Sequence, residues 1–203
     1  MYPSIVSQSE FLESLRAEAG RRAFYPTGAV RCIGSPLFRN QAARNLGCLL
    51  DVDTSVLSWA CLPLALRHSQ TVHVPDFLVQ RADGPVLVDA LSGEAPSWIA
   101  EEAAAHGLRY LPNGLELMGV GFRLENARDL LRYVRWQCPL GDRVRVLSAL
   151  DEHGTASVAE ILSVFREILP MAGLASLILH RFVEIELDET QIGPDTSIRR
   201  WRD

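Results

Sequence analysis

The chain of 203 residues contains no lysine, because all 20 of its basic residues are arginine. This absence excludes every mechanism that depends on a lysine ammonium. Long apolar runs are missing too: no segment approaches the roughly 20 residues that a membrane helix needs. The N-terminal stretch MYPSIVSQSEFLESLR lacks the basic-then-apolar pattern of a secretory signal. The sequence therefore predicts a cytoplasmic protein that does not associate with membranes.

Cysteines are few, and their spacing fits neither zinc nor a disulfide framework. The chain has four, Cys32, Cys48, Cys61 and Cys138, and none forms a C-x-x-C pair. No cluster of histidines completes a zinc spacing. Since the predicted compartment disfavours disulfides, we expect buried free thiols.

The net charge of −5 is unevenly distributed. Residues 1–48 and 123–150 each carry six Arg against three acids, whereas residues 151–203 carry five Arg against ten acids. The overall acidity argues against tight nonspecific binding of nucleic acid. The arginine-rich segments still allow a phosphate contact. Arg128, Arg132 and Arg135, spaced by four and three on a predicted helix, are candidates for contact with solvent, DNA or a protein partner.

The pattern of elements predicts an α/β domain over residues 1–139 and a smaller domain over 140–203. Helices are expected over 7–19, 37–50, 95–107 and 125–138, and strands over 54–67, 72–80, 85–91 and parts of 108–120. They favour a central mixed sheet flanked by helices. After residue 139, three helices are expected in RVRVLSALDEHG, which ends at Gly154, in SVAEILSVFREIL and in MAGLASLILHR. They precede FVEIELDE, which can pair with TSIRRW. Ser157 and Glu160 have the spacing of a capping box. This order is typical of a winged-helix-like domain.

The segment TVHVPDFLVQRADGPVLVDA, residues 71–90, predicts a hairpin in the middle of the sheet with two aspartates among apolar neighbours. A loop over residues 81–84 places Asp76 directly opposite Asp89. A two-residue turn at Asp83–Gly84 instead places Asp76 opposite Leu91 and Asp89 opposite Leu78. In both registers the two carboxylates share one face of the sheet, about 5–8 Å apart at Cβ.

Two buried carboxylates on one face repel each other and lose hydration. Three arrangements relieve this cost. A divalent cation such as Mg²⁺ can lie between them. They can share a proton. Alternatively, each can accept hydrogen bonds from an arginine or a backbone N–H.

The segments HVPDFLV and VLVDA, with the preceding LLDVDTSVLSWACLPLAL and the later ENARDLLRY, resemble the PD-(D/E)xK nuclease superfamily and specifically the TnsA-like transposon endonucleases. The resemblance implies a restriction-endonuclease-like fold over 1–139 followed by the winged-helix-like domain. It also implies that Asp76 and Asp89 are catalytic carboxylates that bind Mg²⁺, which stabilises the phosphate transition state and helps to activate water.

Two of the family's four site elements are replaced in this chain. The family's lysine position is Leu91, and its helix glutamate falls near Ala43, with Asp51 and Asp53 as the nearest acids. An arginine substitute cannot accept a proton at neutral pH. The first hypothesis is therefore a catalytically degenerate nuclease, with weakly bound Mg²⁺ or no metal, that binds DNA or a protein partner in recombination, transposition or regulation. The second is an active Mg²⁺-dependent endonuclease that uses Asp76 and Asp89, with Asp51 or Asp53 as a candidate third acid. The third is a protein-interaction module with no role on nucleic acid.

Other side chains are interpreted as structural. His73 is placed on the strand face opposite Asp76 and is expected to pack in the core or at an edge. Trp59, Trp98 and Trp136 are expected in the core. The predicted helix MAGLASLILHR is nearly all apolar, whereas a helix that reads bases presents polar side chains. This favours a protein partner for the winged-helix-like domain over base reading.

Overall fold

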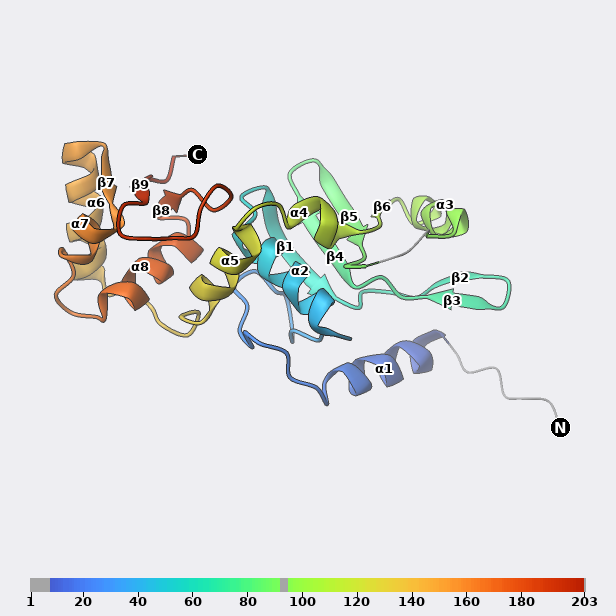
Figure 1. Ribbon diagram of the computed structural model, residues 1–203. Coiled ribbons are helices and arrows are strands. Elements are labelled where there is room, and N and C mark those ends of the chain that lie inside the picture. The colour runs from blue at the N-terminus through green and yellow to red at the C-terminus, as the bar shows by residue number, and fades with distance from the viewer. Residues whose placement is uncertain (1–7, 92–94, 203) are drawn as a thin grey trace. The chain divides into compact units, whose positions relative to one another are not determined.

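The computed structural model describes residues 8–91 and 95–202 (Figure 1). Its contacts divide the chain into two compact units. The first contains the described residues up to Thr27 together with Arg31–Met118, and the second contains Gly28–Val30 and the described residues from Gly119 onward. This division differs from the boundary expected between residues 139 and 140, because residues 119–139 group with the C-terminal part of the chain.

A mixed four-stranded sheet forms the centre of the first unit (Figure 1). Its strands, in spatial order, are β1 (Val56–Cys61), β4 (Phe77–Arg81), β5 (Gly84–Val88) and β6 (Arg109–Leu111). Strand β4 is antiparallel to β1 and β5, whereas β6 is parallel to β5. Helices α2 (Gln41–Val52) and α4 (Gly114–Met118) contact each other, and α3 (Ser97–Ala105) contacts β6. The expected class, a mixed sheet flanked by helices, is confirmed.

Strand β3 (Thr71–His73) pairs with β2 (Leu66–His68) in a separate two-stranded hairpin. The single strand expected over residues 72–80 is therefore wrong, since the chain leaves β3 after His73 and enters β4 at Phe77. Pro75 lies in this break and has no N–H to donate to a ladder. The break interrupts the strict alternation of faces on which the placement of His73 relied.

Aromatic side chains fill the core beside β1 and β4. Trp59 and Phe77 are buried, and their rings meet edge to face with centroids 5.4 Å apart. Phe38, before α2, lies 6.2 Å from the Trp59 ring. The core prediction holds for Trp59, while Trp98 is only partly buried. It is wrong for Trp136, which is 46% exposed, because the helix expected to bury it ends earlier, at Leu131.

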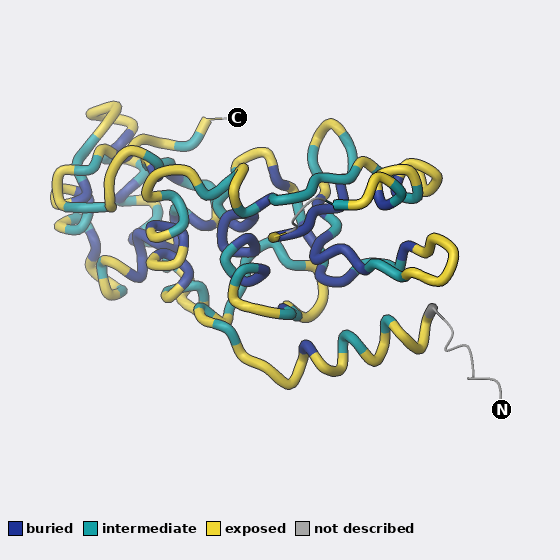
Figure 2. The backbone as a smooth tube through the Cα atoms, turned by 45° about the vertical axis from the view of Figure 1, so that its right-hand side comes forward, coloured by how far each residue is buried: buried dark blue, intermediate teal, exposed yellow. Residues whose placement is uncertain are grey.

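Helix α1 (Gln8–Ala19) is mostly exposed, and Ala19 is the residue that the structure describes as buried in it (Figure 2). Arg16 joins this helix to the segment that follows β1, because its guanidinium donates to Leu62 O at 2.8 Å and to Pro63 O at 3.3 Å. The spacing of Ser7 and Glu10 in the sequence also predicts a capping box for this helix, but Ser7 lies outside the described residues.

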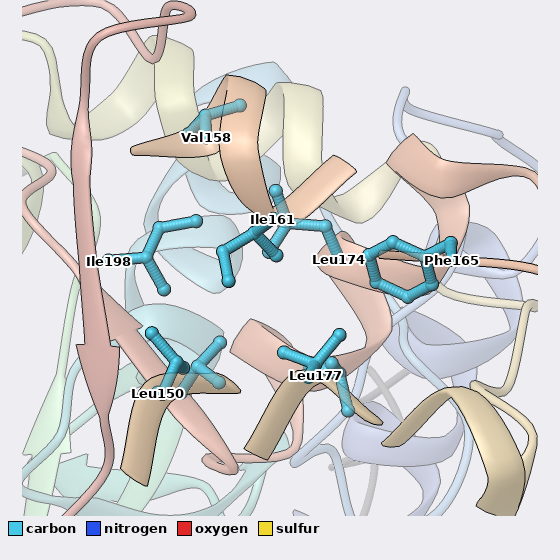
Figure 3. Packing of buried hydrophobic residues seen from close by; sticks show 9 residues of the cluster. Leu150, Val158, Ile161, Phe165, Leu174, Leu177 and Ile198 are labelled. Atoms are coloured by element: carbon cyan, nitrogen blue, oxygen red, sulfur yellow. The ribbon is translucent and has the colours of Figure 1, made fainter. Parts of the chain in front are cut away.

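The second unit contains four helices and a three-stranded sheet. The helices are α5 (Arg123–Leu131), α6 (Leu140–His153), α7 (Val158–Leu162) and α8 (Pro170–Leu179). The strands are β7 (Thr155–Ser157), β8 (Val183–Ile185) and β9 (Ser197–Arg200), and β9 lies between the other two. Figure 3 shows the shared core, where Leu150, Ile161, Leu174, Leu177 and Ile198 point toward one another. None of the helices in residues 8–91 and 95–202 is long and apolar enough to cross a membrane.

Several predicted elements have different extents. The pairing of FVEIELDE with TSIRRW is confirmed, and β7 adds a third strand that was not predicted. The capping box of Ser157 and Glu160 is confirmed, but α7 spans only five residues. Residues 114–118 form helix α4 where a second short strand was expected. All four cysteines are free, but the expectation that they are buried holds only for Cys48 and Cys61, since Cys32 and Cys138 are partly exposed.

Asn126 explains why α5 groups with the second unit. Its side chain is buried and joins α5 to the loop between β8 and β9. Nδ2 donates to Leu187 O and Thr190 O, both at 2.8 Å, and Oδ1 accepts from Ile192 N at 2.9 Å. Arg123 adds a two-point ion pair with Asp188 in the same loop. The amide thus uses both its donors and its acceptor to hold the loop against α5.

Candidate functional site

The register of the hairpin brings Asp76 and Asp89 together. Pairing runs from Phe77 opposite Val88 to Arg81 opposite Gly84, so Ala82 and Asp83 form the turn. Continued by one residue, this register sets Asp76 opposite Asp89, as in the first of the two registers considered. Asp76 N donates to Asp89 Oδ1 at 3.0 Å, and Ala90 N donates to Asp76 Oδ2 at 2.9 Å. Each carboxylate therefore caps the backbone of the other strand.

Arg39 supplies the cation that the two carboxylates require. Its Nη2 lies 2.6 Å from Asp76 Oδ1 and 3.5 Å from Asp89 Oδ1, and its Nε donates to Asp76 Oδ1 at 2.8 Å. The residue precedes Asn40, whose side chain caps α2 by accepting from Ala43 N. This cap fixes the chain direction next to Arg39. The Arg39 side chain is 30% exposed, whereas those of Asp76 and Asp89 are 6% and 2% exposed.

His73 and Tyr110 hold the remaining oxygen of Asp89. His73 Nε2 lies 2.7 Å from Asp89 Oδ2, and the Tyr110 hydroxyl donates to the same oxygen at 2.6 Å. An ionised carboxylate only accepts, so His73 donates through Nε2. The expectation that His73 lies on the opposite face from the aspartates is wrong, because the break at Pro75 reorients the chain between β3 and β4. Trp98 packs edge-on against the His73 ring, 6.5 Å between centroids.

The two carboxylates differ in acidity. Burial raises the pKa of Asp76 and outweighs the lowering by Arg39 and by the Ala90 N–H, so this pKa lies above its usual range. Burial also acts to raise the pKa of Asp89. There the hydrogen bonds from His73 and Tyr110 prevail and hold the pKa below its usual range. Asp89 is therefore the more firmly ionised member of the pair.

The other positions implied by the nuclease resemblance have different surroundings. Leu91, at the lysine position, has a side chain that is 57% exposed, and Ala43, at the glutamate position, is buried in α2. Asp51 Oδ1 accepts from Trp59 Nε1 and from Arg31 N, both at 2.9 Å. Asp53 lies beyond the end of α2 and pairs with Arg81 at 2.9 Å.

The donor set does not fit a divalent cation as it stands. All four carboxylate oxygens of Asp76 and Asp89 accept hydrogen bonds from groups of this chain, and Arg39 already provides the compensating charge. Across the part of the chain that the structure describes, no group of three His, Cys, Asp or Glu side chains is arranged to hold a metal ion. Of the three arrangements left open by the sequence, the structure has the third, in which arginine and backbone N–H groups satisfy the pair.

The three arginines singled out in the sequence belong to the second unit, and all are exposed. Arg128 lies on α5, Arg132 is its C-terminal cap, and Arg135 lies in the turns that follow. The expectation of one continuous helix through Arg135 is wrong. Arg132 forms an ion pair with Asp129 at 3.3 Å, three residues earlier. The arginines therefore present positive charge to solvent along the end of α5 and beyond it.

Three residues of the cluster were not found from the sequence: Arg39, His73 and Tyr110. A signal existed for Tyr110, because parallel pairing places it opposite Leu87, which shares its strand face with Asp89. That signal becomes usable only once the pairing of β5 with β6 is known. Arg39 gave none, since it approaches the aspartates only through the packing of α2 and its preceding loop.

Comparison with models of known protein families finds no match, and comparison with curated protein sequences finds none either. The nuclease resemblance thus depends on the motif residues of the sequence alone.

Proposed function

We propose that this chain is a catalytically degenerate, TnsA-like protein of the restriction-endonuclease-like class, which acts as a binding component in DNA recombination, transposition or regulation. The observation that carries this proposal is the position of Arg39. Its guanidinium compensates the charge of Asp76 and Asp89, the two residues that match the family's catalytic carboxylates. In a cluster of this kind every carboxylate oxygen already accepts a hydrogen bond, and Arg39 supplies the positive charge that a metal would otherwise bring.

The replaced positions support the loss of catalysis. Leu91 cannot supply a cation, and Ala43 cannot supply a third carboxylate. The alternative, an active Mg²⁺-dependent endonuclease with Asp76 and Asp89 as ligands, requires Arg39 to leave both carboxylates before a metal can bind. It also requires a proton acceptor that no arginine supplies at neutral pH.

The order of elements in the second unit supports a winged-helix-like assignment. Helix α6, strand β7, helices α7 and α8, and strands β8 and β9 follow one another, with β9 pairing to both β7 and β8. A helix that reads bases in the α8 position presents polar side chains to the major groove. Most of α8 is instead buried, including Leu174 and Leu177. We therefore favour a protein partner for this unit, with DNA phosphate as the competing ligand of its exposed arginines.

A plasmid-nicking assay tests the catalytic part of the proposal. Purified protein is incubated with supercoiled DNA in Mg²⁺ or Mn²⁺, beside the variant Asp76→Asn. We expect equal, background nicking from both proteins. Nicking by the wild type that disappears in the variant refutes the degenerate assignment and establishes the endonuclease.

A gel-shift series at low salt tests the binding part, since nucleic-acid binding is strongest there. The test variant replaces Arg128, Arg132 and Arg135 by alanine. Its matched control replaces the exposed Arg21, Arg22 and Arg67, an equal loss of charge. If DNA is the ligand, the test variant alone loses affinity and lowers the salt slope by about three, one for each phosphate contact. No shift by the wild type excludes DNA as the ligand and leaves the protein partner.

A further inference from the structure

Two cysteines that are far apart in the sequence, Cys32 and Cys61, come together in the first unit. Cys32 forms an isolated parallel bridge with Trp59 of β1. In this bridge Trp59 N donates to Arg31 O at 3.0 Å, and Ile33 N donates to Trp59 O at 2.7 Å. Cys61 is the last residue of β1 and shares its strand face with Trp59. The bridge therefore directs the Cys32 side chain to the face that carries Cys61.

The two thiols are hydrogen-bonded to each other, and this bond makes them unequal. The bond from Cys32 holds the pKa of Cys61 below its usual range, against the opposite effect of burial. Leu37 N, which donates to Cys61 Sγ at 3.2 Å, lowers this pKa further. The same thiol–thiol bond raises the pKa of Cys32. Because the thiolate is the reactive form of cysteine, Cys61 is the stronger nucleophile of the pair.

We propose that Cys32 and Cys61 form a redox-active pair, which hydrogen peroxide oxidises to a reversible disulfide within one chain. The Cys61 sulfur attacks one peroxide oxygen, the O–O bond breaks, and the second oxygen leaves with the thiol proton as water. The Cys32 sulfur then attacks the sulfenic acid of Cys61. The S–O bond breaks, and a second water carries away the Cys32 proton. Two electrons thus pass from the two sulfurs to one peroxide.

Access and reactivity favour this pair over the other two cysteines. Cys32 is partly exposed and is followed by the exposed residues 33–36, so the pair is open to solvent on this side. A shift of Cys32 toward Cys61 also meets little packing there. Cys48 is fully buried in α2, and burial raises the pKa of Cys138 to about 11. Neither Cys48 nor Cys138 therefore combines exposure with an easily ionised sulfur.

The disulfide connects the segment before α2 to the end of β1. The loop that it closes, residues 32–61, includes Arg39 and the whole of α2. A cross-link stabilises a fold mainly by restricting the unfolded chain, and more so for longer loops. Oxidation therefore stabilises the first unit and holds the segment that carries Arg39 against β1, and a thiol reductant reverses both effects.

Peptide mapping of the full-length chain tests the proposal. The protein is treated with hydrogen peroxide, its remaining thiols are blocked with N-ethylmaleimide, and it is cleaved without reduction after arginine and before aspartate. Cys32 then lies in the peptide 32–39 and Cys61 in the peptide 53–67, which is separate from Cys48. We expect these two peptides to be joined in a product that runs as a single chain on a non-reducing gel. Dithiothreitol should separate them.

The variant Cys32→Ser identifies the attacking sulfur. It should form no cross-link and should accumulate the sulfenic acid of Cys61, which dimedone traps, because the resolving thiol is gone. Cys138→Ser is the matched control and should form the cross-link as the wild type does. Oxidation should raise the urea midpoint of the wild type and of Cys138→Ser, but not that of Cys32→Ser.

The mapping uses the wild type, so it decides the proposal even where Cys32→Ser folds poorly. The proposal is overturned if oxidised wild type yields no joined pair of these peptides, if Cys48 or Cys138 is the main partner in the cross-link, or if the cross-link forms between chains. A cross-link that leaves the urea midpoint unchanged contradicts the restraint on the segment before α2. The inference does not depend on the proposed function, because neither Cys32 nor Cys61 matches a position of the nuclease motif.

Discussion

Arg39 and Asp76 form a close ion pair, with Nη2 2.6 Å from Oδ1, although 37 residues separate them along the chain. This contact joins the segment before α2 to the start of β4. Because Asp89 shares the same guanidinium, the pair also fixes the end of β5. The ion cluster thereby unites three segments of the first unit around two buried carboxylates.

Replacing Arg39 by methionine should lower the free energy of unfolding by about 2–4 kcal/mol, because two buried carboxylates lose their cation. Urea denaturation at neutral pH measures this change. Arg22→Met is the control and should change stability by less than about 0.5 kcal/mol, since Arg22 makes only an exposed pair with Glu18. Equal effects of the two substitutions would show that Arg39 does not stabilise the cluster.

The sequence predicts part of this cluster but not all of it. Asp76 and Asp89 follow from the hairpin, since alternation and turn length restrict them to one face in either register. The position of Arg39 cannot be predicted from the sequence, because its contact with the aspartates depends on where α2 packs. His73 is misplaced by strict alternation, which fails across the break at Pro75. The physical reason is common to both residues: their contacts depend on tertiary packing and an interrupted strand, which periodicity does not encode.

Replacing Tyr110 by phenylalanine should lower the free energy of unfolding by about 1–3 kcal/mol, which is the contribution of a hydrogen bond to a buried charged group. The phenylalanine ring preserves the packing against His73, so the change isolates the hydroxyl that donates to Asp89. Urea denaturation measures the cost, and Tyr25→Phe, at a residue that is 71% exposed, should be nearly silent. An unchanged free energy of unfolding in Tyr110→Phe would mean that the Tyr110 hydroxyl does not stabilise the ionised Asp89.

Asn126→Ala should release the loop between β8 and β9 from α5. Three hydrogen bonds are lost, and we expect a destabilisation of about 2–4 kcal/mol. Hydrogen exchange offers a local measurement, because the Ile192 amide donates to Asn126 Oδ1 and should lose protection. Gln191→Ala, at an exposed position of the same loop, is the control. Unchanged protection of Ile192 in Asn126→Ala would contradict this role.

Asp142 should make the second unit sensitive to acid. Burial acts to raise its pKa, but Arg145 and the backbone N–H groups of Arg166, Glu167 and Ile168 prevail and hold the pKa below its usual range. A carboxyl whose pKa is lower in the folded state stabilises that state above its unfolded pKa of about 3.9. This contribution is lost as the pH falls through the folded pKa.

The variant Asp142→Asn isolates that contribution. At pH 7 it should be less stable than the wild type by about 2–4 kcal/mol, because an amide cannot accept all the hydrogen bonds of the carboxylate. The difference should shrink as the pH falls from about 4, where the carboxyl of the unfolded chain takes up its proton, through the lower pKa of the folded carboxyl. Denaturation curves at a series of pH values measure it, and a difference independent of pH would exclude the charge as its source.

In the second unit, the sequence predicts the elements with strong local signals. The capping box of Ser157 and Glu160 and the helix end at Gly154 follow from residue types that favour those positions. Strand β7 cannot be predicted in this way, because three residues are too few to show the alternation of a strand. The short extent of α7 is missed for a related reason, since its apolar pattern continues beyond Leu162 into a segment that leaves the helix.

The stability of the wild type with and without Mn²⁺ tests the central claim most directly, namely that Arg39 and not a metal compensates Asp76 and Asp89. A cation bound to the folded state at ten times its Kd raises the free energy of unfolding by about 1.4 kcal/mol. Urea denaturation of the wild type and of Asp76→Asn, each in millimolar Mn²⁺ and in salt of matched ionic strength, compares the two responses. We predict that Mn²⁺ changes the stability of both proteins equally. A stabilisation of the wild type that Asp76→Asn abolishes would contradict the claim and identify a working metal site.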